Sequence, residues 1–404
     1  MIELRPARSD EMGAIGSLGG YVYGGAFGDG PDSMTGSANR AEWTLCAFDG
    51  SQLAASFITI PFTMRLNGEA MKMGGVSGVA THPEYRRRGL MRRLMTEATL
   101  EMREQGQTVA ALWASQAAIY QRFGYSIGSV SRRYAVDSVD ISFFDGDGGS
   151  STVEWLSVEA GFDAVRALYI AFIAERTGYL HRSRALWAAG VLEERPDEGP
   201  VHIALSRDGD GQPNGYMVYT LRAGKVAHRA RSQELVIRDL GWLTLDAYRS
   251  LWSYVARHDL VGRAVWATAP ADDPAEELFS EPRMLHTEDG EGAWFRVIDV
   301  EAALSGRGYS QAGQVTLRLP EDDLAPWNAG TYTIETDGEE TTVARSTGEP
   351  DAVVPVKAMA SLFSGYRSAR RLRSWGLLSA DDSAVDRLDR LFETRHLPHF
   401  PDHF

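Results

Sequence analysis

The amino-acid sequence predicts a mixed α/β fold that is divided into three domains. The length of 404 residues is more than one ordinary domain needs. Strand-like runs alternate with helical patterns in the N-terminal part and again in the middle of the chain, whereas short strands separated by turns dominate the C-terminal part. A glycine-rich stretch, Asp145–Ser151, is expected to be a linker. The predicted domains therefore cover residues 1–145, 150–292 and 293–404.

The composition limits the functions that this chain can have. Hydrophobic residues make up 44% of the sequence, which is enough to build packed cores. Cys46 is the single cysteine, so intrachain disulfides are excluded and a thiolate metal site is not expected. The formal charge of −14 argues against nucleic-acid binding and favours cationic ligands if the acidic residues line a cleft, although solubility alone also explains an acidic balance.

The sequence has no features of a signal peptide or a membrane span. Charged residues at Glu3, Arg5, Arg8 and Asp10 interrupt the N-terminus, so no apolar signal core is present. No stretch approaches the roughly 18 uninterrupted apolar residues of a membrane helix. A cytoplasmic location without membrane contact is therefore expected.

The N-terminal domain is predicted to begin with a strand, a helix and a hairpin. Asn67-Gly68 is the strongest hairpin signal in the chain, because both residues tolerate the left-handed backbone of a two-residue turn. A second turn is expected at Asp49-Gly50. The elements predicted around these turns are the strand Ile2–Pro6, a helix from Asp10 towards Tyr23, a flexible loop Gly24–Ser37, and the strands Trp43–Phe48 and Leu53–Leu66.

The segment Gly74–Leu94 predicts a strand, a turn and a helix in close succession. The apolar run Val76–Ala80 is typical of a buried strand and ends at His82-Pro83. Three arginines and a glycine then lead into a helix that is predicted to end near Gly106. The apolar residues of this helix are expected on one face: Leu90, Leu94 and Ala98, with Met91 and Met95 beside them.

This succession favours the binding of a pyrophosphate at the helix start. The backbone N–H groups of Arg87–Met91 have no partner within a helix that begins there, and the helix dipole assists their contact with phosphate oxygens. Gly89 allows the backbone to approach a ligand closely. A basic turn on a solvated helix is the alternative for an isolated arginine-glycine pair, but the strand before the turn and the helix after it favour the phosphate site.

The middle of the chain repeats part of this order. The helix Leu243–His258 lies between the strands Gln233–Leu240 and Arg263–Thr268, but the segment Glu234–Gly241 leads into it without an arginine-glycine turn, so phosphate binding is not expected there. The other predicted elements are the strands Val109–Ala114, Val201–Leu205, Gly215–Leu221, Trp294–Asp299, Val315–Leu319, Gly330–Thr336 and Thr341–Arg345, and the helices Phe162–Thr177, Val356–Ser364 and Ala384–Phe392.

Two motifs together resemble a known family. Arg86–Met91 matches the pattern Q/R-x-x-G-x-G/A at its first and fourth positions and departs from it at the sixth, where Met91 replaces a small residue. Ala114–Tyr125 reads A-S-x-x-x-I-Y-x-R-F-G-Y. In this order, the motifs resemble the enhanced intracellular survival (Eis) acetyltransferases of actinobacteria, a family of Gcn5-related N-acetyltransferases (GNAT). The segment Ala360–Ala369 resembles the C-terminal part of the same family, so the resemblance covers the full chain.

The resemblance implies a fold, an activity and an assembly. The fold is a tandem of GNAT folds, the second of them degenerate, followed by a sterol-carrier-protein-like α+β domain. The activity is transfer from acetyl-CoA, without a metal, to an amine-bearing and polycationic small molecule such as an aminoglycoside, with antibiotic resistance as an expected consequence. The assembly is a homo-hexamer.

The resemblance assigns the acetyl-CoA contacts to three segments of the N-terminal domain. Backbone groups for the pantetheine arm would come from Val79, Ala80 and Thr81. The pyrophosphate and the adenosine end would be held by Arg87, Arg88, Gly89, Leu90, Met91 and Arg92. The cofactor would be flanked from the next strand by Ser115 and Gln116.

The resemblance also places two catalytic groups far apart in the sequence. Tyr120 would donate a proton to the sulfur of the departing CoA, since a phenol with an ordinary pKa of about 10 stays protonated at neutral pH. Tyr125 is interpreted as structural. The α-carboxylate of Phe404 would be the base, on a tail that prolines stiffen and aromatic residues anchor in the site. With an ordinary pKa of about 3.3–3.7, it would take the proton late, from an intermediate that attack has made acidic.

Histidines in the tail offer an alternative base. His403 is better matched to neutral pH than a carboxylate is. A metal site is rejected, because prolines separate the three candidates, and no cysteine or acidic cluster joins them: His396, His399 and His403.

The acceptor pocket and the overall activity have alternatives as well. Trp43, Tyr23 and Phe27 are candidates for the wall of an amine pocket, although packing is the more common role of aromatic residues near a core. Two other functions are weighed against acetyl transfer: a non-catalytic CoA- or lipid-binding protein of the same fold, and an acyltransferase for longer acyl chains.

Overall fold

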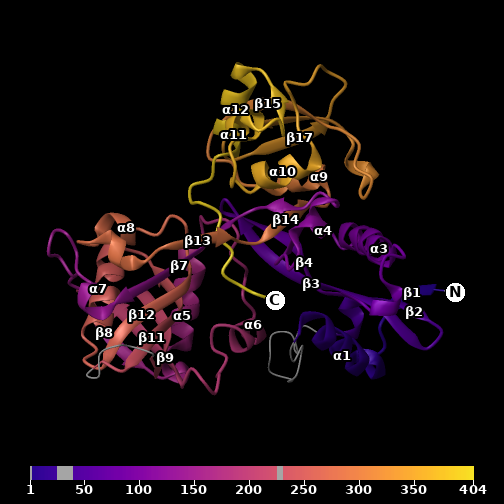
Figure 1. Cartoon of the computed structure of the whole chain (residues 1–404). Coiled ribbons are helices and arrows are strands. Elements are labelled where there is room, and N and C mark those ends of the chain that lie inside the picture. The colour runs from indigo at the N-terminus through magenta and orange to yellow at the C-terminus, as the bar shows by residue number, and fades with distance from the viewer. Residues whose placement is uncertain (1, 25–39, 225–230) are drawn as a thin grey trace. The chain divides into compact units, whose positions relative to one another are not determined.

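The computed structural model describes residues 2–24, 40–224 and 231–404, which fall into two compact units (Figure 1). The first unit comprises Met1–Ser129, Glu175–His181 and Gly292–Phe404, and the second comprises Val130–Ala174 and Arg182–Glu291. Apart from Gly24, the predicted loop Gly24–Ser37 with Phe27 lies outside the described residues.

The first unit contains a seven-stranded sheet with the order β1-β2-β3-β4-β5-β14-β6. Neighbouring strands are antiparallel except β4 and β5, which run parallel and pair only from Met73–Gly75 to Val109–Ala111. Beyond Gly75, β4 therefore continues without β5 as its neighbour. The strands are β1 (Ile2–Pro6), β2 (Thr44–Asp49), β3 (Gln52–Leu66), β4 (Glu69–Thr81), β5 (Val109–Leu112), β6 (Ser126–Ile127) and β14 (Trp294–Val297).

The helix after β4 packs on this sheet through one apolar face. Leu90, Leu94 and Ala98 of this helix are buried, as their spacing predicts, together with Met95 and Met102. Burial of each large side chain stabilises the fold by about 1.5–3 kcal/mol. The spacing of these residues therefore determines which face of the helix packs on the sheet. The helices of this part are α1 (Met12–Tyr23), α3 (Leu90–Glu104) and α4 (Ala117–Gln121).

The C-terminal part of the first unit has a five-stranded sheet with the order β17-β16-β15-β18-β19. Arg307 is buried beside it and donates hydrogen bonds to the carbonyls of Phe363, Leu391 and Phe392, at the ends of two helices. A cation stabilises the negative end of a helix dipole, although burial lowers the pKa of Arg307 to about 10. The elements are α9 (Val300–Gly306), β15 (Gly313–Leu319), β16 (Gly330–Thr336), β17 (Thr341–Arg345), β18 (Ala352–Val353), α10 (Val356–Phe363), α11 (Ala369–Ser374), β19 (Ser379–Ala380) and α12 (Asp382–Phe392).

The second unit contains a seven-stranded sheet with the order β13-β7-β12-β11-β10-β9-β8. The parallel pair β11–β12 with α7 between its strands repeats the arrangement of β4, α3 and β5. No helix in the described part of the chain is long and apolar enough to cross a membrane. The elements are β7 (Val130–Asp137), β8 (Thr152–Leu156), α5 (Val158–Phe172), α6 (Arg184–Ala189), β9 (Val201–Arg207), β10 (Pro213–Ala223), β11 (Gln233–Trp242), α7 (Leu245–Ala256), β12 (Val261–Ala269), α8 (Ala275–Leu278) and β13 (Glu288–Glu291).

The segment Asp145–Ser151, expected to be a linker, is bound to the start of α7. Asp246 in the first turn of α7 accepts hydrogen bonds from the N–H and hydroxyl groups of Ser150 and Ser151. Arg249, one turn later, forms an ion pair with Asp145 at 2.8 Å. The helix start that would face a phosphate in this second fold therefore carries a carboxylate and is covered by the chain.

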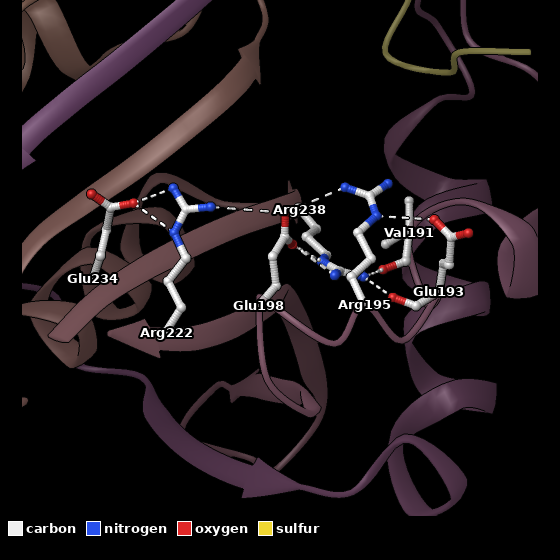
Figure 2. Close-up of polar contacts among 7 residues, drawn as sticks. All are labelled: Val191, Glu193, Arg195, Glu198, Arg222, Glu234 and Arg238. Carbon is white, nitrogen blue, oxygen red and sulfur yellow. Dashed lines mark hydrogen bonds and ion pairs between the residues drawn. The ribbon is translucent and has the colours of Figure 1, made fainter. Parts of the chain in front are cut away.

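Glu198 gathers three arginines of the second unit into one network (Figure 2). Its carboxylate lies 2.7 Å from Arg238, 3.4 Å from Arg195 and 3.9 Å from Arg222, which also pairs with Glu234. Burial alone would raise the pKa of the Glu198 carboxyl, but the hydrogen bond and charge of Arg238 hold that pKa below its usual range. The network fastens the loop after α6 to β10 and β11.

Several expectations about individual elements differ from the structure. Val130–Asp137, attributed to the first domain, forms β7 of the sheet of the second unit. Trp294–Asp299, attributed to the third domain, supplies β14 of the first sheet, where Trp294 pairs with Leu112 of β5. The helix predicted over Phe162–Thr177 ends at Phe172. The strand predicted from Trp43 begins one residue later, at Thr44. An apolar pattern identifies a strand or helix but not its partner or its last turn, which explains these differences.

Residues 175–181 join the first unit instead of extending α5. The N–H of Gly178 donates to the carbonyl of Arg65 at 2.8 Å, and the N–H of Arg65 donates to the carbonyl of Tyr179 at 2.8 Å. Gly178 has a φ of +94°, a conformation outside any right-handed helix. The segment therefore lies beside β3.

A buried ion pair joins the two sheets of the first unit. Arg296 of β14 is fully buried, and its Nη2 lies 2.7 and 2.8 Å from the two carboxylate oxygens of Asp322. The same guanidinium donates a hydrogen bond to the carbonyl of Phe123, immediately after α4. Gly124 follows with a φ of +78°, and a Cβ there would lie 2.1 Å from Nη1 of Arg296. Glycine is thus required both by the backbone conformation and by the approach of the guanidinium.

We expect Gly124→Ala to destabilise the protein more than Gly376→Ala does. Both glycines have a positive φ, but a Cβ at Gly376 would meet nothing within 4 Å. The left-handed conformation alone costs about 1–2 kcal/mol, and overpacking against Arg296 adds about 1–3 kcal/mol at Gly124. The loss of stability in each variant is measured as the shift in the midpoint of urea unfolding. Equal shifts would show that the guanidinium moves aside without cost.

Candidate active site

A bulge in β4 lies at the residues expected to meet the pantetheine arm. The register places Ser56 opposite Ala80 and Ile58 opposite Ser77, so Gly78 and Val79 together face one residue of β3. A bulge of this kind bends the strand and interrupts its ladder. Gly78 has a φ of +54°, and a Cβ there would lie 2.5 Å from the side chain of Ile58.

Two side-chain hydroxyls hold the carbonyl groups of this bulge. Ser56 donates a 2.9 Å hydrogen bond to the carbonyl of Gly78, and Tyr23 donates one of 2.9 Å to the carbonyl of Val79. Tyr23 comes from the end of α1, where the sequence left open whether it lines a pocket or packs. The structure gives it a direct contact with one of the predicted cofactor residues.

The turn before α3 has the open backbone expected of an anion site. Arg87 and Gly89 both have positive φ values, +61° and +76°, and no side chain of the described residues caps the start of α3. A positive φ at a non-glycine residue is strained, and such strain gathers at functional sites. A Cβ on Gly89 would meet nothing within 4 Å, so the space above this residue is open.

The predicted pyrophosphate residues differ in exposure. Arg87, Arg88, Gly89 and Arg92 are exposed, whereas Leu90 is buried in the core of the first sheet. Met91, the departure from the family pattern, is partly buried and packs against the same core. Its side chain therefore contributes to packing at a position where a small residue would leave space.

The strand β5 leads directly to the predicted acid. Ser115 and Gln116 are exposed between β5 and α4, and Gln116 is the N-cap residue of that short helix. Tyr120 lies in α4 and is buried, with its ring centroid 6.0 Å from that of Tyr125. In the described part of the chain, no residue forms a hydrogen bond with the Tyr120 hydroxyl. The hydroxyl of Tyr125, in contrast, lies 3.9 Å from the sulfur of Met95.

Burial raises the pKa of the Tyr120 phenol, and the neighbouring Tyr23 and Tyr125 raise it further. The phenol therefore carries its proton throughout the neutral range. A protonated hydroxyl for which the described residues offer no acceptor can donate its hydrogen bond to a bound ligand.

The C-terminal tail returns to the first sheet. The ring of Phe404 lies 5.0 Å from that of Phe62 in β3, and a Cβ on Gly75 of β4 would lie 2.9 Å from it. Trp43 is packed against the same apolar cluster. Phe400 is buried, with its ring centroid 5.9 Å from that of Phe404.

Trp113, which follows β5, binds the tail next to Phe404. Its Nε1 donates a 3.1 Å hydrogen bond to the carbonyl of Asp402, and its ring stacks on His403 with a centroid distance of 3.8 Å. Sequence reasoning missed Trp113, although an aromatic residue at the end of a buried strand marks it as a candidate for contact across the sheet edge. The sequence likewise showed no sign of the role of Arg296, because the partner of Arg296, Asp322, lies in a distant part of the chain.

The tail histidines are spread along the chain and do not converge. His403 stacks on Trp113, whereas the ring of His399 lies 5.4 Å from that of Tyr179. Within residues 2–24, 40–224 and 231–404, no group of three histidine, cysteine or acidic side chains is arranged to hold a metal ion.

A cavity of about 700 Å³ lies in the second unit, apart from the predicted site residues. It lies beside α5, the edge strand β8 and its neighbour β9, and Trp155, Phe162 and His202 are among its lining residues. None of the residues expected to bind acetyl-CoA or to catalyse acetyl transfer contributes to it.

Family models match three successive parts of the chain. Acetyltransferase (GNAT) domain models match residues 3–128 and 178–297, and a sterol carrier protein domain model matches residues 300–401. An uncharacterized N-acetyltransferase of Streptomyces coelicolor is 26% identical over 78% of this chain and 78% of its own length. The N-acetyltransferase Eis of Mycobacterium tuberculosis is 26% identical over 85% of this chain and 84% of its own length.

Solved structures agree over the full length. An Eis protein of Mycobacterium abscessus has a TM-score of 0.82 at 25% identity, and a GCN5-related N-acetyltransferase of Anabaena variabilis has the same fold with a TM-score of 0.86 at 21% identity. Each alignment covers 100% of both chains. The GNAT fold implies acetyl-CoA as the cosubstrate. The chain is an acyltransferase that belongs to the GCN5-related N-acetyltransferases, with the Eis proteins among its relatives.

Proposed function

We propose that this chain transfers the acetyl group of acetyl-CoA to a primary amine of a polycationic small molecule, of which aminoglycosides are an example. One observation carries the proposal: the turn Arg86–Leu90, Tyr120 and Phe404 are all attached to or packed on β4 and β5, the two strands that separate. The formal charge of −14 supports a cationic acceptor, because an acidic protein attracts polyamines.

Residues of β4 and α3 would bind the cosubstrate. The backbone of Val79–Thr81, next to the bulge, would pair with the pantetheine arm as an added strand does. The free N–H groups at the start of α3 and the exposed Arg87, Arg88 and Arg92 would hold the pyrophosphate. Ser115 and Gln116 would flank the arm from the end of β5.

Tyr120 would act as the general acid. The acceptor nitrogen attacks the thioester carbonyl carbon, the C–N bond forms, and the C–S bond breaks. The sulfur leaves with the electron pair of that bond and takes the phenolic proton of Tyr120. The raised pKa of Tyr120 keeps this proton available at the pH at which the amine is reactive.

The α-carboxylate of Phe404 would take the proton that the amine loses. The ammonium group of the tetrahedral intermediate formed by attack on the carbonyl is far more acidic than an ordinary alkylammonium ion, so a weak base suffices at that stage. The aromatic contacts of Phe62 and Trp113 support this role, because they direct the tail to β4 and β5. His403 would be the base instead if the carboxylate is dispensable.

Acetyl transfer itself is tested by thiol release from acetyl-CoA in the presence of kanamycin, with the amine omitted as the control. We expect release that depends on the amine and a product that is heavier by one or more acetyl groups in mass spectrometry. Propionyl-CoA and longer acyl-CoA substrates in the same assay define the acyl preference. Measurable CoA binding without amine-dependent thiol release from any aminoglycoside would contradict the proposed acceptor class.

Replacement of Tyr120 by phenylalanine removes the proposed acid and keeps the ring. We expect kcat to fall by about 10²–10⁴-fold, with little change in the affinity for CoA. Tyr125→Phe is the matched control, since it removes only the contact of a buried hydroxyl with the Met95 sulfur. Similar kcat values for the two variants would assign Tyr120 to packing.

Extension of the chain by one glycine after Phe404 moves the carboxylate and keeps every side chain. We expect this extension, and deletion of Phe404, to abolish turnover while CoA affinity stays nearly unchanged. His403→Ala, which keeps the terminal carboxylate, is expected to remain active. Full activity of the extended chain together with loss of activity in His403→Ala would assign the base to His403.

A further inference from the structure

The tail is held at its start as well as at its end. After α12 ends at Phe392, the chain leaves the C-terminal part of the first unit and runs to the first sheet (Figure 1). The backbone N–H of Arg395 donates a 2.9 Å hydrogen bond to Oδ1 of Asn67. The N–H of His399 then donates one of 3.0 Å to the carbonyl of Thr177.

Asn67 has more contacts than its own turn requires. It lies at the tip of the β3–β4 hairpin with a φ of +48°, yet only 7% of its surface is exposed. Its Nδ2 donates hydrogen bonds of 3.1 Å to the carbonyl of Gly308 and 3.0 Å to the hydroxyl of Ser310. These two bonds fix the orientation of the amide, so that Oδ1 faces the N–H of Arg395.

Thr177 connects the first two points at which the tail is held. Its hydroxyl accepts a 2.9 Å hydrogen bond from the N–H of Asn67, and its carbonyl accepts the N–H of His399. A Cβ on the next residue, Gly178, would lie 2.2 Å from the carbonyl oxygen of His399. The tail therefore passes against bare backbone at this point. We call Asn67 and Thr177 the tail clasp.

The clasp restricts where the end of the tail can reach. Arg395 and Phe404 are nine residues apart. A flexible chain of that length has an end-to-end distance of about 15–18 Å and can point in any direction. Fixed points at Arg395 and His399 leave only a short segment to be placed by Trp113. The bond between Asn67 and Arg395 comes first along the tail, so it sets the direction in which the following residues run. In this way Asn67, at the hairpin tip, affects the position of Phe404, which is far from it in the sequence.

We propose that Asn67 is a positioning residue for Phe404: through the tail clasp it holds the start of the tail on the course that brings Phe404 to Phe62 of β3 and Gly75 of β4. The inference rests on the proposed function, in which the carboxylate of Phe404 is the base. The hairpin tip thus has a role in turnover although it contacts neither the turn at Arg86–Leu90 nor Tyr120 in any described hydrogen bond.

Release of Phe404 by carboxypeptidase A tests the clasp without reference to activity. Asn67→Gly keeps the left-handed turn and removes the amide with its three hydrogen bonds, and we expect Phe404 to be released at least about 2–10-fold faster, the change that loss of the bond to Arg395 alone produces. Arg395→Pro removes only the N–H partner of that bond and is expected to give this minimum. Arg395→Ala keeps the N–H and loses only the exposed ion pair of the Arg395 side chain with Glu175, which contributes little to stability. It serves as the control for the side chain that Arg395→Pro also loses, with release close to that of the unaltered chain.

Turnover is then measured for the same variants. We expect kcat of Asn67→Gly to fall by a factor comparable to the gain in release, with CoA affinity unchanged, and the double variant with Arg395→Pro to be no worse than either single one. Unchanged release in both variants would overturn the inference. Faster release with unchanged kcat would support the clasp but contradict the role of Phe404 in the proposed function.

Discussion

The guanidinium of Arg296 ties together the parts of the first unit on which the candidate site depends. It lies on β14, binds both oxygens of Asp322 from the C-terminal part, and donates to the carbonyl of Phe123 after α4. With both charges removed from water, the loss of either partner leaves an uncompensated charge in the core, at a cost of about 3–5 kcal/mol. The helix that carries Tyr120 and the part that carries the tail are thereby fixed to the same strand.

The bulge and the turn of β4 prepare the neighbouring region for a ligand. Hydroxyls of Ser56 and Tyr23 bind the carbonyls of Gly78 and Val79, so these polar groups are satisfied although the ladder is interrupted. Arg87 keeps a strained backbone at the start of α3. Among the described residues, β4 beyond Gly75 has no strand partner on the side of β5, and the start of α3 has no side-chain cap. This arrangement suits an extended ligand with an anionic end.

The sequence predicted the local features of the site better than its distant connections. The strand, turn and helix at Val76–Ala98 were predicted from residue order alone, because periodicity and glycine placement act over a few residues. The return of the tail followed from family resemblance, since no local pattern shows where a chain end is bound. The sequence also did not predict that β7, which follows the first GNAT segment, joins the sheet of the second unit, or that β14, which follows the second unit in sequence, joins the sheet of the first. Arg296 and Asp322 were not recognised either, because each reads as an ordinary surface charge until its partner is known.

The position of β14 has a consequence for synthesis of the protein on the ribosome. This strand lies between β5 and β6 in the first sheet, yet it comes from residues 294–297, after the whole of the second unit. A nascent chain that ends before this point has the turn at Arg86–Leu90 and the helix with Tyr120 but not the strand that joins their sheet. Because domains emerge from the ribosome in order, the second unit completes its own sheet first, and the candidate active site is finished among the last parts of the molecule.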